Sequence, residues 1–496
     1  MRSNATTACL ITAATVAGSG TSTAALLPSQ VLLVWNSRSA QSQEIRNAYV
    51  AARPGVRELD LNDAAVAFDA TTASPAVVSR AAYLSRIRGP IKSYLDGAAP
   101  GGGVLAERIV AIVTTRGLPA QIQGVSEFDL SSTWSSVESE LTLLQQDLEA
   151  AVAGGTFTNR YSGVVANPYS ATTGIGIDQF SRANVRTPRS FVLTSPGGYI
   201  VTGLTPGDIY LVTRLDAAPT AGATAAENVA ALIRRGIING FDPCGVRAVF
   251  DRWSCAPLDD DGLGVIVPPR DDFPNAHAAL LGVGVRSTFD QTGAFLTNAN
   301  LPPGGPFIAV GSYGTNHALG GCGGSPPGLG AYVSTGYPWH PAAFFVSYES
   351  WNGTSMIDGV ARGGQGQVLD FISSGGSFTI GSVTEPFTFS VPRTELLAKN
   401  LLIGGMTFAE AAYTALPVLS WQWTPVGDPL ATVRLGAFPC RGDANGDGVV
   451  DFADLALVLG RFGLSQPCGA GDLNRDGVVN LSDLNLVLSF YGGGCR

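Results

Sequence analysis

Two short acidic stretches near the C-terminus have the residue types and the spacing of a calcium-binding loop. The first begins at Asp443 and the second at Asp472, so the two starts lie 29 residues apart. Calcium takes six to eight oxygen ligands, and a twelve-residue loop supplies them from positions 1, 3, 5, 7, 9 and 12. The sequence therefore predicts two Ca²⁺ sites with the following ligands: Asp443, Asn445, Asp447, the Val449 carbonyl, Asp451 and Asp454 in the first loop, and Asp472, Asn474, Asp476, the Val478 carbonyl, Asn480 and Asp483 in the second.

The other loop positions support this prediction with one departure. Position 6 must turn sharply, and it is glycine in both loops, Gly448 and Gly477. Position 12 is Asp454 or Asp483 where an EF-hand has glutamate. The shorter side chain predicts looser coordination at this position.

Helix is predicted on one side of each loop only. Proline and glycine precede both loops, for example Pro439 and Pro467, and they oppose an entering helix. The residues after each loop have apolar side chains at helical spacing. Two interpretations stay open: these side chains dock on a partner, or they pack on each other inside a small tail folded by calcium. They are Phe452, Leu455, Leu459 and Phe462, then Leu481, Leu484, Leu488 and Tyr491.

This duplicated loop and helix resembles the type I dockerin, a module that attaches enzymes to cohesin-bearing scaffolds. The resemblance covers about residues 440–496 and implies a cohesin-like or other surface protein as partner. In dockerins small hydroxyl residues often follow the ninth position, whereas Phe452-Ala453 and Leu481-Ser482 stand here. Cys440, Cys468 and Cys495 bracket the repeats, so the module is a divergent, cysteine-bearing form.

Composition limits the functions of the remaining chain. With 496 residues, two or three domains are expected. The net charge is −9 and the only lysines are Lys92 and Lys399, which argues against nucleic acid as a partner. No run of eighteen apolar residues is present, so no transmembrane segment is predicted.

The N-terminus predicts export. Residues 1–25 combine an early Arg2, a mildly apolar stretch and small residues around Ala25, as in a secretory signal peptide. Six of the seven cysteines follow this segment, an even number that suits disulfides outside the cytoplasm. Cys244 and Cys255 form the predicted local pair. We therefore expect a secreted or surface-associated protein.

Between these two ends, segments of strand and helix character alternate. This order predicts an α/β domain over residues 28–436, with a mainly parallel sheet covered by helices on both faces. The stretch 320–330 is rich in glycine and predicts a loop. Strands are predicted at 31–36, 56–61, 109–113, 209–212, 246–250, 278–281, 307–310, 343–346 and 378–380, and helices at 39–54, 77–96, 225–238, 367–372 and 407–416.

Ligands of such sheets bind at the carboxyl ends of the strands. Polar residues stand at several predicted strand ends, and together they mark one edge as the place for a site. Three of them, Ser312, Ser347 and Glu385, are candidate catalytic residues as nucleophile or acid. His277, His317 and His340 lack metal-ligand spacing. The other polar strand ends are Asn36-Ser37, Thr115-Arg116, Arg214 to Asp216, Asp251-Arg252 and Glu349-Ser350.

Several segments of the large domain resemble a widespread family of exported bacterial proteins of unknown function. The family implies no established reaction. To a lesser extent the last helix and its Gly-Asp-Pro resemble gingipain-like cysteine peptidases of the caspase type, which carry His-Gly and Cys at neighbouring strand ends. Here those ends read Ser312-Tyr313-Gly314 and Ser347 to Ser350, so the dyad is absent. The matching segments are 31–37, 109–119, 136–141, 209–216, 384–386, 407–422 and 426–430.

Two functions follow from these patterns. The first is an exported protein that a calcium-loaded tail attaches to a partner, with a large domain that binds a ligand at its sheet edge. The alternative is an extracellular hydrolase, peptidase-like or part of polysaccharide breakdown, tethered by the same tail. Convergence of Arg116, Arg214 and Glu385 in one pocket would favour the hydrolase.

Overall fold

The computed structural model describes seventeen stretches of the chain. The predicted signal peptide, the 320–330 loop, His317 and every cysteine except Cys244 lie outside them. The described residues are 26–69, 76–123, 134–146, 165–189, 191–193, 200–237, 240–252, 272–292, 294–314, 333, 336–358, 368–386, 388–434, 442–445, 449–465, 469–474 and 477–493.

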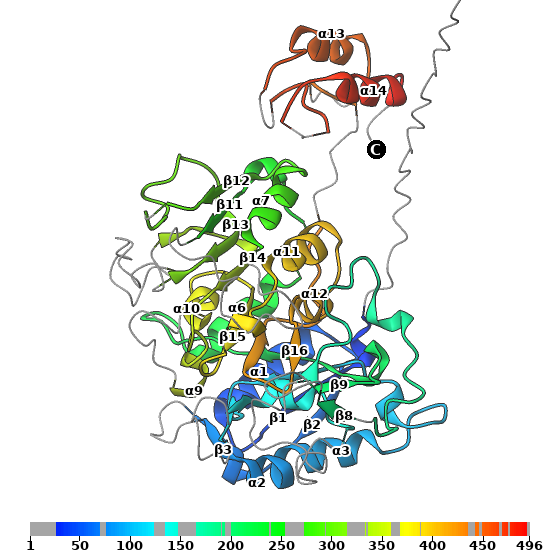
Figure 1. The fold of residues 1–496 in the computed structure, drawn as a ribbon, viewed down its shortest axis with the longest axis vertical. Coiled ribbons are helices and arrows are strands. Elements are labelled where there is room, and N and C mark those ends of the chain that lie inside the picture. Colours follow the sequence, from blue (N-terminus) through cyan, green and yellow to red (C-terminus); the bar gives the residue numbers. More distant parts are fainter. Residues whose placement is uncertain are drawn as a thin grey trace, which may run out of the picture.

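A mixed, mostly parallel sheet of ten strands forms the large domain (Figure 1). Every residue of the inner strands β4, β10, β11 and β13 is buried, so both faces of the sheet are covered. The α/β prediction is thereby confirmed. In spatial order the strands are β12 (Arg286–Asp290), β11 (Arg247–Asp251), β13 (Phe307–Ser312), β14 (Trp339–Ser347), β15 (Phe378–Ser382), β17 (Trp423–Val426), β10 (Leu211–Leu215), β4 (Ala111–Thr115), β1 (Val31–Trp35) and β2 (Arg57–Asp60).

Two groups of helices lie against this sheet. In the first, α1 and α10 both contact α6, and in the second, α7 contacts α11 and the π-helix that follows it. The first group is α1 (Ala40–Ala52), α6 (Ala225–Arg235) and α10 (Val368–Ser373), and the second is α7 (Phe273–Leu281), α11 (Thr394–Leu397), the π-helix Ala398–Ile403 and α12 (Phe408–Ala415).

Shorter elements complete the large domain. Two small sheets have the orders β16-β7-β9-β8 and β3-β5-β6. Their strands are β16 (Val418–Leu419), β7 (Val165–Ala166), β9 (Ile200–Thr202), β8 (Phe191–Leu193), β3 (Val77–Ser79), β5 (Gln121–Gln123) and β6 (Ser135–Ser136); the short helices are α2 (Arg80–Ala82), the π-helix Tyr83–Arg88, α3 (Gly89–Leu95), α4 (Val137–Leu141) and α9 (Ser355–Asp358).

The strand predicted at 278–281 is wrong, because these residues form the end of α7. A short apolar run fits a buried helix as well as a strand, and here Pro274 near the helix start and Gly282 at its end set the outcome. The helix predicted over 77–96 begins only at Arg80, after β3. The other predicted strands and helices are present with shifted ends.

The C-terminal segment has its own helices and its own core. Helices α13 (Phe452–Gly460) and α14 (Leu481–Phe490) contact each other (Figure 1). Four valines, Val450, Val458, Val479 and Val487, form the buried centre of this small core, whereas the large core spans 26–433. Among the described residues no helix is long and apolar enough to cross a membrane.

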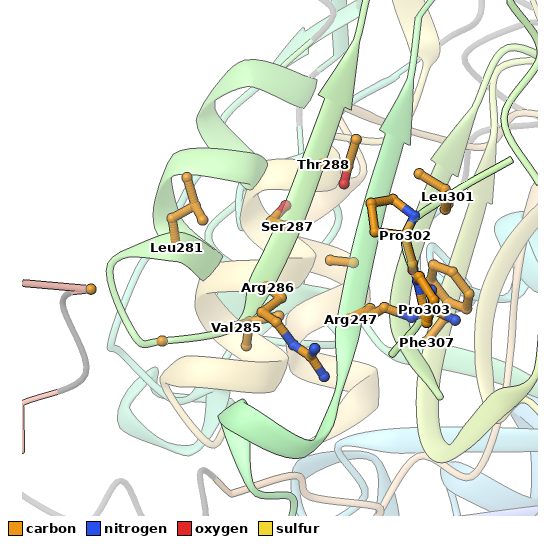
Figure 2. Close-up of a pocket in the computed structure, with 13 residues that line it drawn as sticks. Arg247, Leu281, Val285, Arg286, Ser287, Thr288, Leu301, Pro302, Pro303 and Phe307 are labelled. Carbon is orange, nitrogen blue, oxygen red and sulfur yellow. The ribbon is translucent and has the colours of Figure 1, made fainter. Parts of the chain in front are cut away.

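The amino ends of β11 and β12 border a cavity of about 380 Å³ at the outer edge of the sheet (Figure 2). Leu281, Val285 and Phe307 belong to its apolar wall, and Arg247 and Arg286 supply its charges. This cavity lies at the amino ends of strands, whereas the sequence predicts a site at their carboxyl ends.

Candidate functional site

The polar strand ends of the two halves of the sheet lie on one common edge. Gln121, which follows β4, donates its side-chain amide to the Val383 carbonyl, which follows β15, at 3.2 Å. At the opposite edge, Arg235 at the end of α6 donates to the Gly376 carbonyl, just before β15, at 2.7 Å. The carboxyl ends of β4 and β15 therefore share the edge where the sequence predicts a site.

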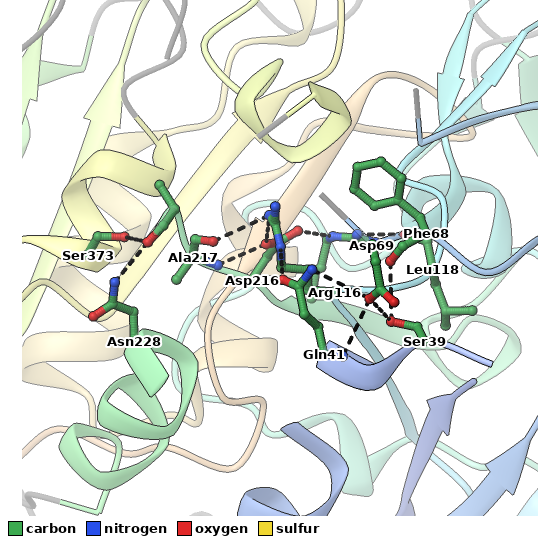
Figure 3. Close-up of polar contacts among 12 residues, drawn as sticks. Ser39, Gln41, Phe68, Asp69, Arg116, Leu118, Asp216, Ala217, Asn228 and Ser373 are labelled. Atoms are coloured by element: carbon green, nitrogen blue, oxygen red, sulfur yellow. Dashed lines mark hydrogen bonds and ion pairs between the residues drawn. The ribbon is translucent and has the colours of Figure 1, made fainter. Parts of the chain in front are cut away.

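At the carboxyl ends of the neighbouring strands β4 and β10, Arg116 and Arg214 meet at the carboxylate of Asp216. Figure 3 shows Arg116 beside Asp216. Asp216 accepts from Nη1 of Arg116 and from Nε of Arg214, both at 2.8 Å. Arg214 also donates to Glu138 of α4 at 3.1 Å and to the Leu118 carbonyl at 2.7 Å. All four charged side chains are fully buried.

The contacts of Arg214 are those of a structural brace. Burial alone would lower the pKa of Arg214, but the charges of Asp216 and Glu138 outweigh it and raise the pKa. Neither Arg116 nor Arg214 bonds to Glu385, which is half-buried after β15. The convergence of both arginines with Glu385 that would favour a hydrolase is not found, since Asp216 and Glu138 neutralise the arginines instead.

The start of α1 binds a carboxylate from the same chain. Asp69 accepts from the Ser39 hydroxyl at 2.6 Å and from the amides of Ala40 at 3.2 Å and Gln41 at 3.4 Å. Amides at a helix start attract anions because they lack partners in the helix and carry the positive end of its dipole. The Gln41 side chain also accepts from Nε of Arg116 at 2.8 Å (Figure 3). Asp69 thus occupies the anion position and links α1 to the arginine cluster.

Two candidate catalytic residues lie side by side. Ser312 ends β13, Ser347 ends β14, and the register pairs them directly. The Ser347 hydroxyl donates to Glu349, and the Ser312 hydroxyl accepts from the Gly314 amide at 2.9 Å. A carboxylate bonded to a serine has the geometry of a general base. Both serines are buried, with 0% and 1% of their surface exposed.

In the C-terminal segment, both predicted loops make the same hydrogen bonds. The carboxylate of Asp454 accepts from the amides of loop positions 2, 3 and 9 at 2.7, 3.0 and 2.8 Å. Asp483 accepts from the equivalent amides at 2.7, 2.9 and 2.8 Å. Since a carboxylate has about four lone-pair sites, each keeps one for an ion. Position 12 can thus act as a monodentate ligand, unlike the bidentate glutamate of an EF-hand.

The remaining ligand positions are only partly described. Gly477 has a φ of +91°, as the turn requires, and its amide donates to Asp472 at 3.1 Å. Asp447, Gly448 and Asp476 lie outside the described residues. Within the described residues, no group of three or more His, Cys, Asp or Glu side chains could hold a metal ion. The oxygen-rich donor set fits calcium, and Ca²⁺ binding stays a prediction.

Each loop is tied to the end of the other unit's helix. Val450 of the first loop donates to the Gly493 carbonyl at 3.0 Å and accepts from the Gly492 amide at 2.8 Å, both after α14. Val479 of the second loop makes the equivalent pair of bonds, at 3.0 and 2.8 Å, with the residues after α13. The two units are thus interlocked by main-chain hydrogen bonds.

The eight apolar residues predicted to lie at helical spacing after the two loops divide into two sets. Leu455 and Leu484 pack against the valine core. The remaining six are exposed, from 50% for Phe462 and Tyr491 to 68% for Phe452. They form three pairs at the 29-residue spacing of the repeat: Phe452 with Leu481, Leu459 with Leu488, and Phe462 with Tyr491. We call these six residues the exposed apolar face.

Cys244 is disulfide-bonded. Cys255 lies outside the described residues, so the predicted pairing of these two stays a prediction.

We did not predict from the sequence that Gln41 and Asp69 belong to the polar cluster around Arg116. Gln41 could have been found from its place in the first turn of a helix that directly follows a buried strand. Asp69 stands in a loop without periodicity, so only the fold shows that it reaches the start of α1.

No protein-family model, no curated protein and no solved structure matches the chain. The resemblances to a dockerin, to an exported bacterial family and to gingipain-like peptidases accordingly stay predictions, and the function must be argued from the residues themselves.

Proposed function

We propose that this is an exported protein whose C-terminal module binds two calcium ions and attaches the large domain to a protein partner, cohesin-like or another surface protein. The observation that carries the proposal is the exposed apolar face. Six large apolar side chains remain at least half exposed although the module has its own core. Exposed apolar groups that repeat in this way favour a docking surface over internal packing.

Calcium would be held by the twelve ligands named above. The bound ion would relieve the repulsion among the loop carboxylates and so supply folding free energy to a small module. The position-12 carboxylates, Asp454 and Asp483, are already fixed by backbone amides. The loop shape that an ion needs is therefore supported by the chain itself.

Retention on the producing cell tests the docking role. We expect the wild-type chain to stay with the cell envelope in calcium and to be released by a chelator. Phe452→Ser combined with Leu481→Ser should release the chain while calcium binding, measured by calorimetry, is retained. Ile175→Ser is the matched control, because Ile175 is exposed in the large domain. Equal retention of all three proteins would exclude the exposed apolar face as the docking surface.

A hydrolase is the second candidate, favoured by the hydrogen bond from Ser347 to Glu349. Ser347→Ala should then abolish labelling by a serine-directed fluorophosphonate. Since the gingipain-type dyad is absent, thiol-directed inhibitors should leave any activity unchanged, and Cys322→Ala should be functionally silent apart from disulfide effects. Loss of a peptidase activity in Cys322→Ala, with folding intact, would favour a cysteine enzyme instead.

A further inference from the structure

The cavity at the amino ends of β11 and β12 contains an electrostatic conflict. Arg247 and Arg286 are direct partners in the register of these two parallel strands. Like charges placed opposite each other on neighbouring strands cost free energy. Burial lowers the pKa of Arg247, and the charge of Arg286 lowers it further. Within the described residues neither arginine forms an ion pair with an acidic side chain. Among the residues that the structure describes, the two positive charges of this cavity therefore have no acidic side chain as a counter-charge.

Only one of the two arginines is available for a ligand. Arg247 donates to the Gly305 carbonyl at 2.8 Å, the Pro302 carbonyl at 2.6 Å and Asn298 Oδ1 at 2.6 Å, so all three of its nitrogens are engaged. Arg286 is exposed and makes a single long hydrogen bond of 3.4 Å to the Cys244 carbonyl. The guanidinium of Arg286 can thus turn toward an anion.

The wall of the cavity is mainly apolar. Leu281, Val285 and Leu301 line it, and Phe307 lies beneath the Arg247 guanidinium at 4.1 Å (Figure 2). The volume of about 380 Å³ suits a small organic molecule. An ion such as free phosphate would leave the apolar wall unused, and a purely apolar molecule would leave Arg286 without a counter-charge.

We propose that this cavity binds an organic carboxylate with an apolar body, its carboxylate on Arg286 and its body against Leu301 and Phe307. A planar carboxylate matches a single guanidinium because both can form two parallel hydrogen bonds. The carboxylate can belong to a free acid or to the C-terminus of a peptide that lies along β12, which is an edge strand of the sheet. Gly477 of the second predicted calcium loop also lines the cavity, but the residues proposed to hold the ligand all belong to the large domain.

Calorimetry on the full chain tests the proposal with phenylacetate and hexanoate, against phenylacetamide and hexanamide as neutral counterparts. The acids should bind and the amides should not. Arg286→Gln should weaken acid binding about tenfold or more, as expected for the loss of a charge-assisted hydrogen bond, and Arg286→Lys should retain part of it. Arg234→Gln is the matched control, because Arg234 is an exposed arginine of α6.

A second arm identifies the source of the carboxylate. A short peptide ending in Leu-Phe is compared with its C-terminally amidated form. Binding of the free-carboxylate peptide alone, without the small acids, assigns the site to chain ends. Binding of the small acids assigns it to free acids. The proposal is overturned if neither class binds at millimolar concentration, if the amides bind equally well, or if Arg286→Gln binds the acids as tightly as the wild type.

Discussion

At the scale of single residues, the charged side chains at the carboxyl ends of β4 and β10 neutralise one another. Two arginines and two acids from three elements form one buried, electrically balanced cluster. Removing one member of a buried ion pair costs more than the pair contributes, because the partner stays buried without a counter-charge. The cluster is thus a sensitive point for stability.

Asp216→Asn should lower the free energy of unfolding of the large domain by about 3–5 kcal/mol, because Arg116 and Arg214 lose their shared carboxylate. Asp63→Asn is the matched control, since Asp63 pairs with Arg86 at an exposed position, where about 1 kcal/mol or less is expected. Denaturant unfolding followed by tryptophan fluorescence measures both, because all seven tryptophans precede residue 436. Equal losses in the two variants would show that the buried cluster contributes no more to stability than an exposed ion pair.

The buried Asp272 makes stability depend on pH. Burial raises its pKa to about 7, although the amide of Glu395 and the Tyr348 hydroxyl donate to it. The folded state therefore holds a proton that the unfolded chain releases near pH 4. The stabilisation is present in full below that value and is lost as pH rises through about 7.

Asp272→Asn should accordingly flatten the fall in stability between about pH 4 and pH 7. Tryptophan-monitored unfolding at a series of pH values measures the slope. The substitution also removes an acceptor for a backbone amide, so the baseline stability should drop. A slope that is unchanged in the variant would show that another group titrates.

At the scale of elements, the start of α1 packs against Gly117, two residues after β4, without space for a side chain. Gly117 has a φ of +98°, and a Cβ there would lie 2.3 Å from the Ser39 hydroxyl oxygen. Gly117 also accepts from the Phe68 amide at 2.9 Å, which places Asp69 at the start of α1. One glycine thus brings together β4, α1 and the loop that carries Asp69.

Gly117→Ala should therefore destabilise the large domain by several kcal/mol, the sum of a left-handed backbone and a steric clash. Gly101→Ala separates the two effects, because Gly101 has a φ of +83° and nothing within 4 Å of the added Cβ. About 1 kcal/mol is expected there. Thermal unfolding compares the two variants, and equal shifts would exclude the clash.

Buried strands were predictable from sequence because a parallel sheet covered on both faces needs continuous apolar runs, as in Val31–Trp35 and Phe307–Ser312. The edge strand Arg286–Asp290 was missed, because it is partly exposed and carries polar residues. The common edge was predictable from strand ends, and Ser312 and Ser347 lie at strand ends as predicted. The ion pairs of Arg214 with Glu138 and of Arg116 with Asp216 were missed, because tertiary packing alone brings these residues together.

At the scale of the whole molecule, the chain has two separate hydrophobic cores. The large one joins residues 26–433, and the small one contains four buried valines. So small a core supplies little stability by itself. Calcium binding should therefore stabilise the small core and leave the stability of the large core unchanged.

Calcium should protect residues 440–496 from trypsin at Arg461 and Arg475 and should leave the tryptophan-monitored unfolding of the large domain unchanged. Asp443→Ala with Asp472→Ala should remove the protection. The comparison is made with and without a reductant, because bonds through Cys440, Cys468 and Cys495 could hold the module without the ion. Equal cleavage with calcium and with chelator under reducing conditions would contradict the two calcium sites.

The main-chain hydrogen bonds between the two units of the module indicate how the tandem could have arisen. Val450 and Val479 each find their backbone partners beyond the helix of the opposite unit. A solitary ancestral unit would have left those groups unpaired, whereas two identical chains could have satisfied them by mutual exchange. The present tandem has the hydrogen-bond pattern of such a homodimer, fused end to end into one polypeptide.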